Sequence, residues 1–320
     1  MIVVRDDETS KLSTRESVMA IGVFDGLHLG HQAVIDMLLH LDGERASDAV
    51  ATVVTFDPHP AQVLAPEHAP RLLGTLEQRL EGFEALGIEQ VRVVTFDRHL
   101  ASESASDFIA RVLVGELRAC QIVVGEDFRF GHDRAGDVAL LSAEGQRLGF
   151  GVDEAPSFGE PRWSSSAVRE TLARGDVEAA TSMLGRPFVL RGRVEHGDAR
   201  GGELGFATAN IATEPLQLVP LDGIYAGAAR TPDRQWRRAA ISIGTRPQFY
   251  ENGAPLVEVH LPGYEGDLYG ASLDVAFLSR LRGEEVFSDV DALVAQIGRD
   301  VQQTIEIFKK FSTFTSALLE

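Results

Sequence analysis

Cysteine is almost absent from this sequence, in which Cys120 is the only one. A single cysteine can form no disulfide within the chain and no cysteine cluster around a metal. Long apolar runs are missing too: none approaches the ~20 residues that a membrane-spanning helix needs, and no secretory signal opens the sequence. We therefore expect a cytoplasmic globular protein that has no membrane partner.

Lysine is also scarce, with Lys11, Lys309 and Lys310 as the only examples. None of them lies in a motif, and the Gly-x-x-x-x-Gly-Lys-Ser/Thr pattern of a P-loop does not occur. A phosphate must therefore be bound by arginine, histidine, backbone amides or a metal. The formal net charge of −18 argues against a general nucleic-acid partner. It leaves a small phosphorylated substrate open, because local groups dominate inside a cleft.

The length of 320 residues suggests two domains, and the period of the apolar residues changes from 3.6 to 2 after Arg186-Pro187. We therefore assign residues 1–186 to the first domain and 187–320 to the second. In the first domain, continuous apolar runs alternate with helical segments, which indicates a doubly wound, Rossmann-like α/β fold around a parallel sheet. The expected strands are 18–24, 50–56, 90–95 and 121–125, the expected helices are 32–41, 75–86 and 105–117, and residues 1–16 are expected to form an irregular lead-in.

In the second domain, apolar residues alternate with a period of 2 in short segments split by turns, which indicates a small antiparallel barrel. Its last segment, residues 289–311, has apolar residues at helical spacing and is expected to be a long amphipathic helix packed on that barrel. The expected strands are 188–195, 224–229, 239–243, 256–261 and 273–277.

The most informative stretch runs from Gly22 to His31 and reads Gly-Val-Phe-Asp-Gly-Leu-His-Leu-Gly-His. It places His28 and His31 where a helix begins, and Gly30 between them allows close backbone approach. Helix-start amides and imidazole donors suit an anion, most naturally a phosphate. The stretch resembles the signature of the nucleotidyltransferase superfamily, whose members attack the α-phosphate of a nucleoside triphosphate. The further candidate binding residues in it are Gly22, Phe24, Asp25, Gly26 and Gly30.

Other polar groups of the first domain follow the ends of predicted strands. Asp57-Pro58 follows the second strand and Asp127 the fourth, and ligands of such domains lie beyond the carboxyl ends of the strands. Each loop alone is more typical of a rigid turn. Further on, three serines precede a helix, which by itself is the composition of an N-cap. A similar Ser-Ser-Thr-x-x-Arg segment of the superfamily binds the triphosphate, which implies the same role for Ser164, Ser165 and Arg169.

In the second domain, a glycine-rich loop after His196 leads into a strand that carries Thr208 and Asn210. Residues two apart on a strand point to the same face, so this hydroxyl and amide could hold Mg²⁺ with nucleotide phosphates. Glu258 interrupts an otherwise apolar strand and could act as a general base toward an attacking alcohol. Taken alone, each feature is more often an ordinary polar strand face.

The order of motifs resembles that of the prokaryotic bifunctional riboflavin kinase/FAD synthetase family over about residues 18–307. The resemblance rests on the stretch at 22–31 combined with the segments 204–210, 223–226, 243–247, 258–261 and 266–270. It implies that the barrel phosphorylates riboflavin with ATP and that the α/β domain adenylylates FMN to FAD. It also implies a catalytic base at Glu258, charge stabilisation by His28 and His31, and Mg²⁺ at Thr208 and Asn210. Further ATP and flavin contacts are assigned to Gly192, Gly197, Arg200, Gly205, Phe206 and Arg282.

Two positions of the barrel depart from the pattern of this family. Ala207 stands where a proline is usual, and Gly202 stands where an arginine is common. The alternatives are an FAD synthetase whose barrel only binds flavin or supports the fold, and a flavin-sensing protein without turnover. Another acceptor, such as pantetheine phosphate or nicotinamide mononucleotide, is a third.

Overall fold

The computed structural model describes residues 1–45, 48–156, 163–196, 206–245 and 255–311. The described chain divides into two compact units. Of the described residues, the first unit contains those in 1–70 and 76–163, and the second contains those in 71–75 and 164–311. The predicted division between residues 186 and 187 concerns the functional domains and stays a prediction.

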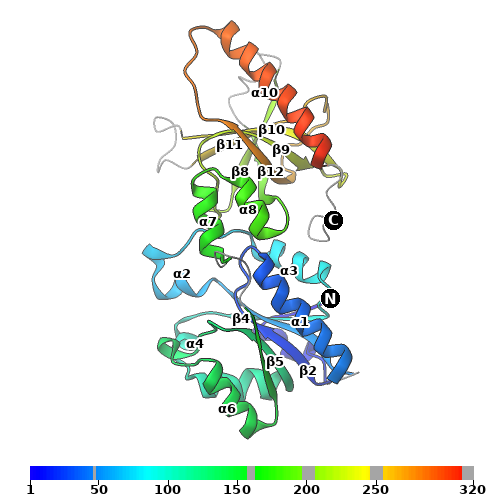
Figure 1. The fold of residues 1–320 in the computed structure, drawn as a ribbon, viewed down its shortest axis with the longest axis vertical. Helices are drawn as coiled ribbons and strands as arrows, with labels where there is room; N and C mark the ends of the chain where they lie inside the picture. The colour runs from blue at the N-terminus through cyan, green and yellow to red at the C-terminus, as the bar shows by residue number, and fades with distance from the viewer. Residues whose placement is uncertain (46–47, 157–162, 197–205, 246–254, 312–320) are drawn as a thin grey trace. The chain divides into compact units, whose positions relative to one another are not determined.

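The first unit is built on a parallel sheet of six strands in the order β1-β4-β3-β2-β5-β6 (Figure 1). Helices cover both of its faces: α1 packs on β2 and β5, while α5 and η3 pack on the opposite face through Phe108 and Ile109. The predicted doubly wound α/β fold is therefore confirmed. The strands are β1 (Ile2–Val4), β2 (Ser17–Ile21), β3 (Val50–Asp57), β4 (Gln90–Thr95), β5 (Ala119–Gly125) and β6 (Gly151–Ala155). The helices are η1 (Asp6–Lys11), α1 (Leu29–Arg45), α2 (Pro60–Leu64), η2 (Pro66–His68), α3 (Leu76–Ala85), α4 (Arg98–Ser102), α5 (Ala105–Phe108), η3 (Ile109–Glu116), η4 (His132–Arg134) and α6 (Val138–Leu148).

The predicted irregular lead-in at residues 1–16 is wrong. Strand β1 pairs in parallel with β4, and helix η1 follows it. Arg92, which is 1% exposed on β4, forms an ion pair of 2.7 Å with Asp6 just after β1. A strand of three residues is too short to show a hydrophobic period, so its pairing depends on partners elsewhere in the chain.

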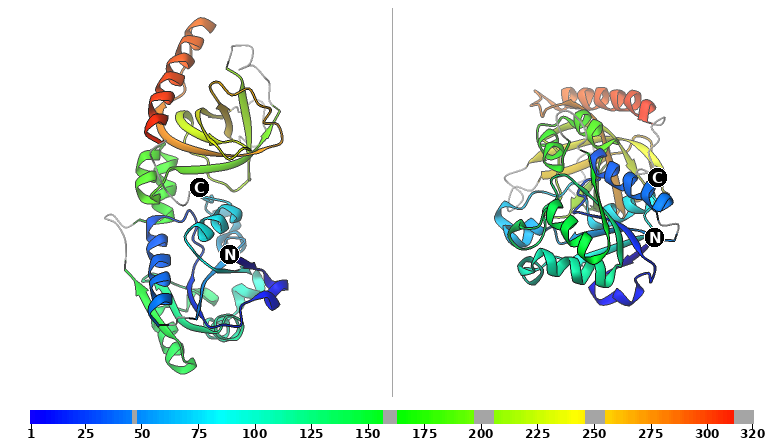
Figure 2. Two further views of the ribbon diagram at one scale, coloured as in Figure 1. Left: turned by 90° about the vertical axis from the view of Figure 1, so that its right-hand side faces the viewer. Right: turned by 60° about the horizontal axis from the view of Figure 1, so that its bottom comes forward.

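The second unit is a closed antiparallel barrel in the order β10-β11-β8-β7-β12-β9. Helix α10 packs along β9, β10 and β12 (Figure 2). The ring of its Phe311 lies 5.7 Å from that of Trp236 between centroids. The barrel and its long helix are thus confirmed. The strands are β7 (Phe188–Glu195), β8 (Thr208–Thr213), β9 (Gly223–Arg230), β10 (Trp236–Thr245), β11 (Pro255–His260) and β12 (Ser272–Arg282). The helices are α7 (Ser165–Ala173), α8 (Val177–Leu184) and α10 (Val290–Phe311).

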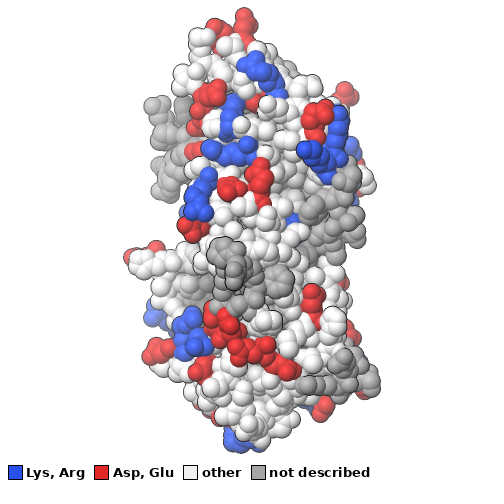
Figure 3. Space-filling view, viewed as in Figure 1, with Lys and Arg blue, Asp and Glu red and all other residues white. Residues whose placement is uncertain are grey.

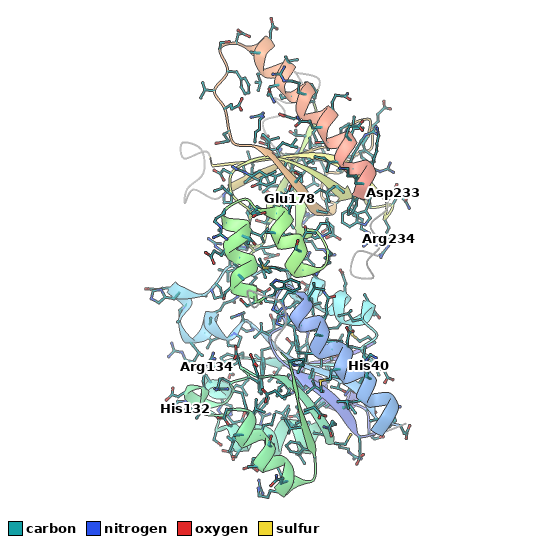
Figure 4. All side chains as sticks on the ribbon, viewed as in Figure 1. His40, His132, Arg134, Glu178, Asp233 and Arg234 are labelled. Carbon is teal, nitrogen blue, oxygen red and sulfur yellow. The ribbon has the colours of Figure 1, made fainter. Side chains whose placement is uncertain are left out.

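Charged side chains of both signs are interspersed on the face drawn in Figure 3. The short connection between β9 and β10 shows how such residues are used locally, with Asp233 and Arg234 at its tip (Figure 4). There the Thr231 hydroxyl donates to the Asp233 carboxylate at 2.6 Å, and Arg237 contacts Thr231 from β10 at 3.0 Å. These contacts close the hairpin without involving either candidate site.

Candidate active sites

The first candidate site is the loop between β2 and α1, which lies at the carboxyl end of a central strand. The order of strands reverses direction between β2 and β5, so this loop and the one that carries Asp127 leave the sheet at its topological switch point. Such a point is where ligands bind in open α/β sheets. Strand β2 ends at Ile21, and the Gly22 N–H still donates to the Val54 carbonyl at 3.0 Å.

The loop then turns sharply through residues with a positive φ. Phe24 (56°) and Leu27 (43°) adopt this conformation although they are not glycine, and Gly26 (81°) lies between them. Non-glycine residues in that region each carry about 1–3 kcal/mol of strain. Burial of the two side chains offsets this cost, since Phe24 and Leu27 are each 2% exposed and the Phe24 ring packs on Phe83. The loop is therefore held in one conformation by the burial of these two side chains.

The two histidines form a single stacked unit. Their ring centroids lie 3.6 Å apart at an interplanar angle of 22°, and His28 is 6% exposed. The backbone N–H of His31 donates to Nδ1 of His28 at 3.3 Å, which assigns the proton of a neutral His28 to Nε2. Gly30 makes this possible, because a Cβ there would lie 3.1 Å from the His28 ring. The pair and the N-terminus of α1 together offer donors to an anion.

A buried arginine that the sequence did not single out lies beneath this loop. Arg79 of α3 is 5% exposed, and its Nη1 donates to the Val23 carbonyl at 2.7 Å. Its Nη2 lies 4.0 Å from the Asp57 carboxylate at the end of β3. Burial lowers the pKa of Arg79, while the charges of Asp25 and Asp57 act in the opposite direction. The helical period of α3 predicted a buried face, but nothing local distinguishes this arginine from a surface one.

The second candidate site is the outer face of the barrel wall. Val257 and Val259 are buried in the barrel core, so Glu258 between them points to the opposite face. In the ladder between β8 and β11, Asn210 lies opposite Glu258 and Thr208 lies opposite His260. Side chains paired in this way have Cβ atoms about 4.5–5.5 Å apart. A hydroxyl, an amide and a carboxylate are thereby collected on one surface.

His260 is the second residue that the sequence analysis missed. Its Nδ1 lies 2.8 Å from the Ala207 carbonyl, and its ring meets Phe206 edge-on at 5.5 Å between centroids. A carbonyl oxygen can only accept, so Nδ1 carries a proton. The available signal was its spacing: two residues after Glu258 on a strand, it had to share the face of that carboxylate.

Comparisons with known proteins match each half of the chain to a family. A family described as FAD synthetase matches residues 10–167, and one described as riboflavin kinase matches residues 184–308. The chain is 38% identical over 295 residues to the bifunctional riboflavin kinase/FMN adenylyltransferase of Escherichia coli strain K12, covering 91% of this chain and 92% of that protein. Its counterpart in Bacillus subtilis strain 168 is 35% identical over 297 residues, covering 92% and 93%.

The chain belongs to the bifunctional riboflavin kinase/FMN adenylyltransferase family. Its activities are those of riboflavin kinase and FMN adenylyltransferase, which produce FMN and FAD from riboflavin, FMN and ATP. The resemblance inferred from the motifs is thus confirmed, and the alternatives without kinase activity or without turnover are not supported.

A solved structure described as a macrolide-efflux protein from Streptococcus pneumoniae also aligns with the chain. The TM-score is 0.84 at 28% identity, and the alignment covers 95% of this chain and 99% of that one. The efflux description concerns the streptococcal protein. Within the described ranges of this chain, none of the helices has the length and apolar character of a membrane span.

The remaining predicted residues of the FMN adenylyltransferase site lie on different elements. Asp57 ends β3 and precedes Pro58, and Asp127 follows β5. Ser164 is the N-cap of α7, where its hydroxyl accepts from the Ala167 N–H at 3.2 Å, and Ser165 is the first residue of that helix. Arg169 donates through Nε to the Arg71 carbonyl at 2.6 Å. These contacts lie in the second unit, and a nucleotide role for the three α7 residues stays a prediction.

In the riboflavin kinase half, two predicted residues have a clear structural setting. Gly192 is buried in the barrel wall, where a Cβ would meet the Ala212 carbonyl oxygen at 2.5 Å. Arg282 forms an ion pair of 2.8 Å with Asp300 of α10 and lies over the Phe287 ring. Direct ligand contacts of both stay predictions. The predicted residues Gly197, Arg200 and Gly205, and the departure at Gly202, lie outside the described residues.

Proposed function

We propose that the outer face of the barrel wall is the site of riboflavin phosphorylation. The observation that carries this proposal is the register of β8 and β11, which sets Asn210 opposite Glu258 and leaves Thr208 on the same face. Phosphoryl transfer needs a base for the attacking hydroxyl and oxygen ligands around the phosphates. This arrangement supplies both within one strand pair.

In this proposal, Glu258 accepts the proton of the riboflavin 5′-hydroxyl as that oxygen attacks the γ-phosphorus of ATP. The bond between the γ-phosphorus and the bridging oxygen breaks, and ADP leaves with the electron pair. Thr208 and Asn210 orient the phosphates. A carboxylate within hydrogen-bond reach of the hydroxyl contributes about 10²–10⁴-fold to the rate of such a step.

The fit of Mg²⁺ to this face follows from the donor set. A threonine hydroxyl and an asparagine carbonyl are hard oxygen ligands, and Mg²⁺ typically takes few protein ligands together with phosphates and water. Thr208 and Asn210 would hold the ion, which supplies charge neutralisation on the β- and γ-phosphates. Glu258 is left as the base in this scheme.

We place adenylyl transfer at the loop of His28 and His31. An oxygen of the FMN phosphate attacks the α-phosphorus of ATP, and pyrophosphate leaves as the bond to the bridging oxygen breaks. FMN phosphate is ionised near neutral pH, so this step needs no strong base. The histidine donors and the amides at the start of α1 stabilise the charge that gathers on the transferring phosphate. Asp57, Asp127, Ser164, Ser165 and Arg169 are proposed to help bind the nucleotide or FMN, and the cytoplasmic location stays a prediction.

One assay tests whether the two activities use separate sites. Riboflavin, FMN and FAD are separated by chromatography after incubation of the full chain with MgATP and either riboflavin or FMN. We expect His28→Ala to lower FAD formation about 10²–10³-fold with riboflavin phosphorylation retained. Glu258→Ala should lower FMN formation by about the same factor with FAD formation from FMN retained. Equal damage to both activities in either variant would contradict two separate sites.

A further inference from the structure

Arg79 is a buried cation for which the mechanism above has no role. It lies on α3 and is 5% exposed, yet its guanidinium reaches the carboxyl ends of two strands. Nη1 donates to the Val23 carbonyl at 2.7 Å and lies 3.3 Å from the Thr55 hydroxyl oxygen. Burying a charge is costly unless it is paired and hydrogen-bonded. Because burying the charge of Arg79 is costly, we ask which groups its contacts hold in place.

The Val23 carbonyl is the first of these contacts, and it receives two donors. The Thr55 hydroxyl also donates to it, at 3.2 Å. Because a peptide bond is planar, fixing the Val23 C=O also fixes the direction of the Phe24 N–H. Phe24 is the residue at which the chain enters its turn with a φ of 56°. Arg79 and Thr55 therefore define the peptide plane at which the loop of His28 and His31 begins.

The charge of Arg79 is the second contribution. Asp25 is 3% exposed, Asp57 lies 4.0 Å from Nη2, and both carboxylates interact electrostatically with the guanidinium. Two carboxylates at the carboxyl edge of the sheet would repel a nucleoside triphosphate bound there. Arginine stays protonated in proteins, so it offsets this negative charge throughout the working pH range.

We propose that Arg79 is a positioning residue for adenylyl transfer. It fixes the Val23 carbonyl, and thereby the turn that presents the histidine pair, and it offsets the charges of Asp25 and Asp57 where the triphosphate binds. This inference rests on the proposed use of the His28 loop for that reaction. Arg79 itself is too buried to be assigned a contact with substrate.

Arg92 offers a matched control in the same unit. It is 1% exposed, and its charge is balanced by Asp6 at 2.7 Å and Glu116 at 3.0 Å. Those contacts join η1, β4 and η3 and involve no residue of the histidine loop. Replacing either arginine by methionine removes a buried positive charge and leaves an uncharged side chain of similar length. Only the change at residue 79 removes one of the two donors to the Val23 carbonyl.

The experiment compares Arg79→Met, Arg79→Lys and Arg92→Met in the full chain, with kcat and KM measured for FAD formation at a temperature where circular dichroism shows each variant folded. We expect Arg79→Met to lower kcat about 100-fold, the scale of a small misplacement of catalytic groups. Arg79→Lys, which keeps the charge and one donor, should recover activity to within about tenfold of wild type on the same reasoning. Arg92→Met should stay within about threefold, and riboflavin phosphorylation should be unchanged in all three, because neither arginine belongs to the barrel unit.

The outcomes separate this inference from the function on which it rests. If Arg79→Met matches Arg92→Met in kcat while His28→Ala abolishes FAD formation, only the role of Arg79 is refuted. If His28→Ala keeps FAD formation, the proposed site is wrong and the inference fails with it. If Arg79→Met does not fold, Thr55→Val decides: it removes the second donor to Val23 and should lower kcat about fivefold, the value of one hydrogen bond. An unchanged kcat in Thr55→Val would then count against the proposal.

Discussion

The two units assemble their candidate sites in opposite ways. In the α/β unit, the central groups come from one continuous stretch, residues 22–31, at the end of strand β2. In the barrel unit, Asn210 and Glu258 are distant in sequence and meet only because β8 and β11 pair in a particular register. A one-residue slip of that register would turn Glu258 into the barrel core. The first site is therefore specified by a loop conformation and the second by a strand pairing.

This difference predicts how the sites respond to damage. A loop fixed by buried contacts should lose function when one of the side chains in those contacts is removed. A strand face should depend on whatever holds the strand ends in position. Four experiments test the contrast, beginning with the one that should show the largest effect.

The histidine pair should behave as one unit. The rings of His28 and His31 stack at 3.6 Å between centroids, so each ring orients the other, and the backbone N–H of His31 also donates to Nδ1 of His28. We expect His28→Ala and His31→Ala each to lower FAD formation about 10²–10³-fold. The double variant should form FAD only slightly more slowly than the less active single variant, because the effects of substituting groups that act together are not additive. The rate of FAD formation from FMN, measured at saturating ATP for each variant, gives these fold losses.

His40 is the matched control for this pair. It lies further along α1, is exposed, and contacts the Asp36 carbonyl through Nδ1 at 2.6 Å (Figure 4). His40→Ala should leave FAD formation within about twofold of wild type, as surface substitutions usually do. Additive losses in the His28 and His31 double variant would show that the two rings act separately.

The barrel site should depend on His260, which holds the residue before Thr208. His260→Leu removes the donor to the Ala207 carbonyl and should raise the KM for MgATP in riboflavin phosphorylation about 3–10-fold, the value of one hydrogen bond. His260→Asn places an N–H near the position of Nδ1 and should restore most of the loss. The KM for riboflavin should change less than that for MgATP, because Thr208 is proposed to orient the phosphates of ATP.

A change at residue 207 sharpens the same test. Proline fixes φ, so Ala207→Pro should hold the start of β8 without help from His260. In that background His260→Leu should cost less than in wild type. An equal cost in both backgrounds, or no rescue by His260→Asn, would show that His260 does not act through the Ala207 carbonyl.

The contrast between loop and register also explains what the sequence could predict. The stretch from Gly22 to His31 contains its turn, the start of a helix and the close approach at Gly30 within ten residues. The local pattern was therefore sufficient to single out this stretch as a candidate site. The fold class followed in the same way, since buried parallel strands and alternating barrel strands differ in period. Glu258 and Asn210 were singled out one strand at a time, and their pairing was not predictable without the register.

The residues that were missed share one property: their partners are remote in sequence. Arg79 reads as an ordinary arginine of an amphipathic helix until Val23 and Asp57 are seen beside it. Strand β1 reads as an irregular lead-in until it pairs with β4. The first expected strand was drawn to residue 24, although β2 ends at Ile21, because apolar Val23 and Phe24 continue the pattern into the turn. Composition cannot distinguish a buried turn from the end of a strand.

Stability should separate the two units as well. Gly192 lies in the barrel wall, where a Cβ would collide with Ile211 and lie 2.5 Å from the Ala212 carbonyl oxygen. Gly192→Ala should therefore destabilise the barrel by about 1–3 kcal/mol, the usual cost of overpacking. Gly125 ends β5, where no atom of the described residues lies within 4 Å of an added Cβ, so Gly125→Ala should be nearly neutral. Urea unfolding followed by tryptophan fluorescence in a Trp163→Phe background, which leaves Trp236 of the barrel as the reporter, measures the first change, and equal destabilisation by both substitutions would refute the argument.

The smallest expected effect concerns the open edge of the α/β sheet, for which the closed barrel has no equivalent. Partial burial raises the pKa of Asp6, but hydrogen bonds from Thr95 and Arg92 outweigh it and hold that pKa below its ordinary value. The folded pKa is thus lower than the unfolded one, so the carboxylate stabilises β1 above the unfolded pKa and loses this effect as pH falls through the folded pKa. Asp6 is largely exposed, so Asp6→Asn should cost only about 0.5 kcal/mol at pH 7.

Amide hydrogen exchange at residues 2–4 reports this edge directly, because the Ile2 N–H donates to the Glu89 carbonyl at 2.8 Å. At pH 7 the exchange of β1 should be faster in Asp6→Asn than in wild type, while Asp7→Asn, at the neighbouring exposed position, should match wild type. The difference between Asp6→Asn and wild type should shrink once the solution is acidic enough to protonate Asp6 in the folded protein. A difference that persists unchanged in acid would mean that the Asp6 side chain stabilises β1 through packing and not through its charge.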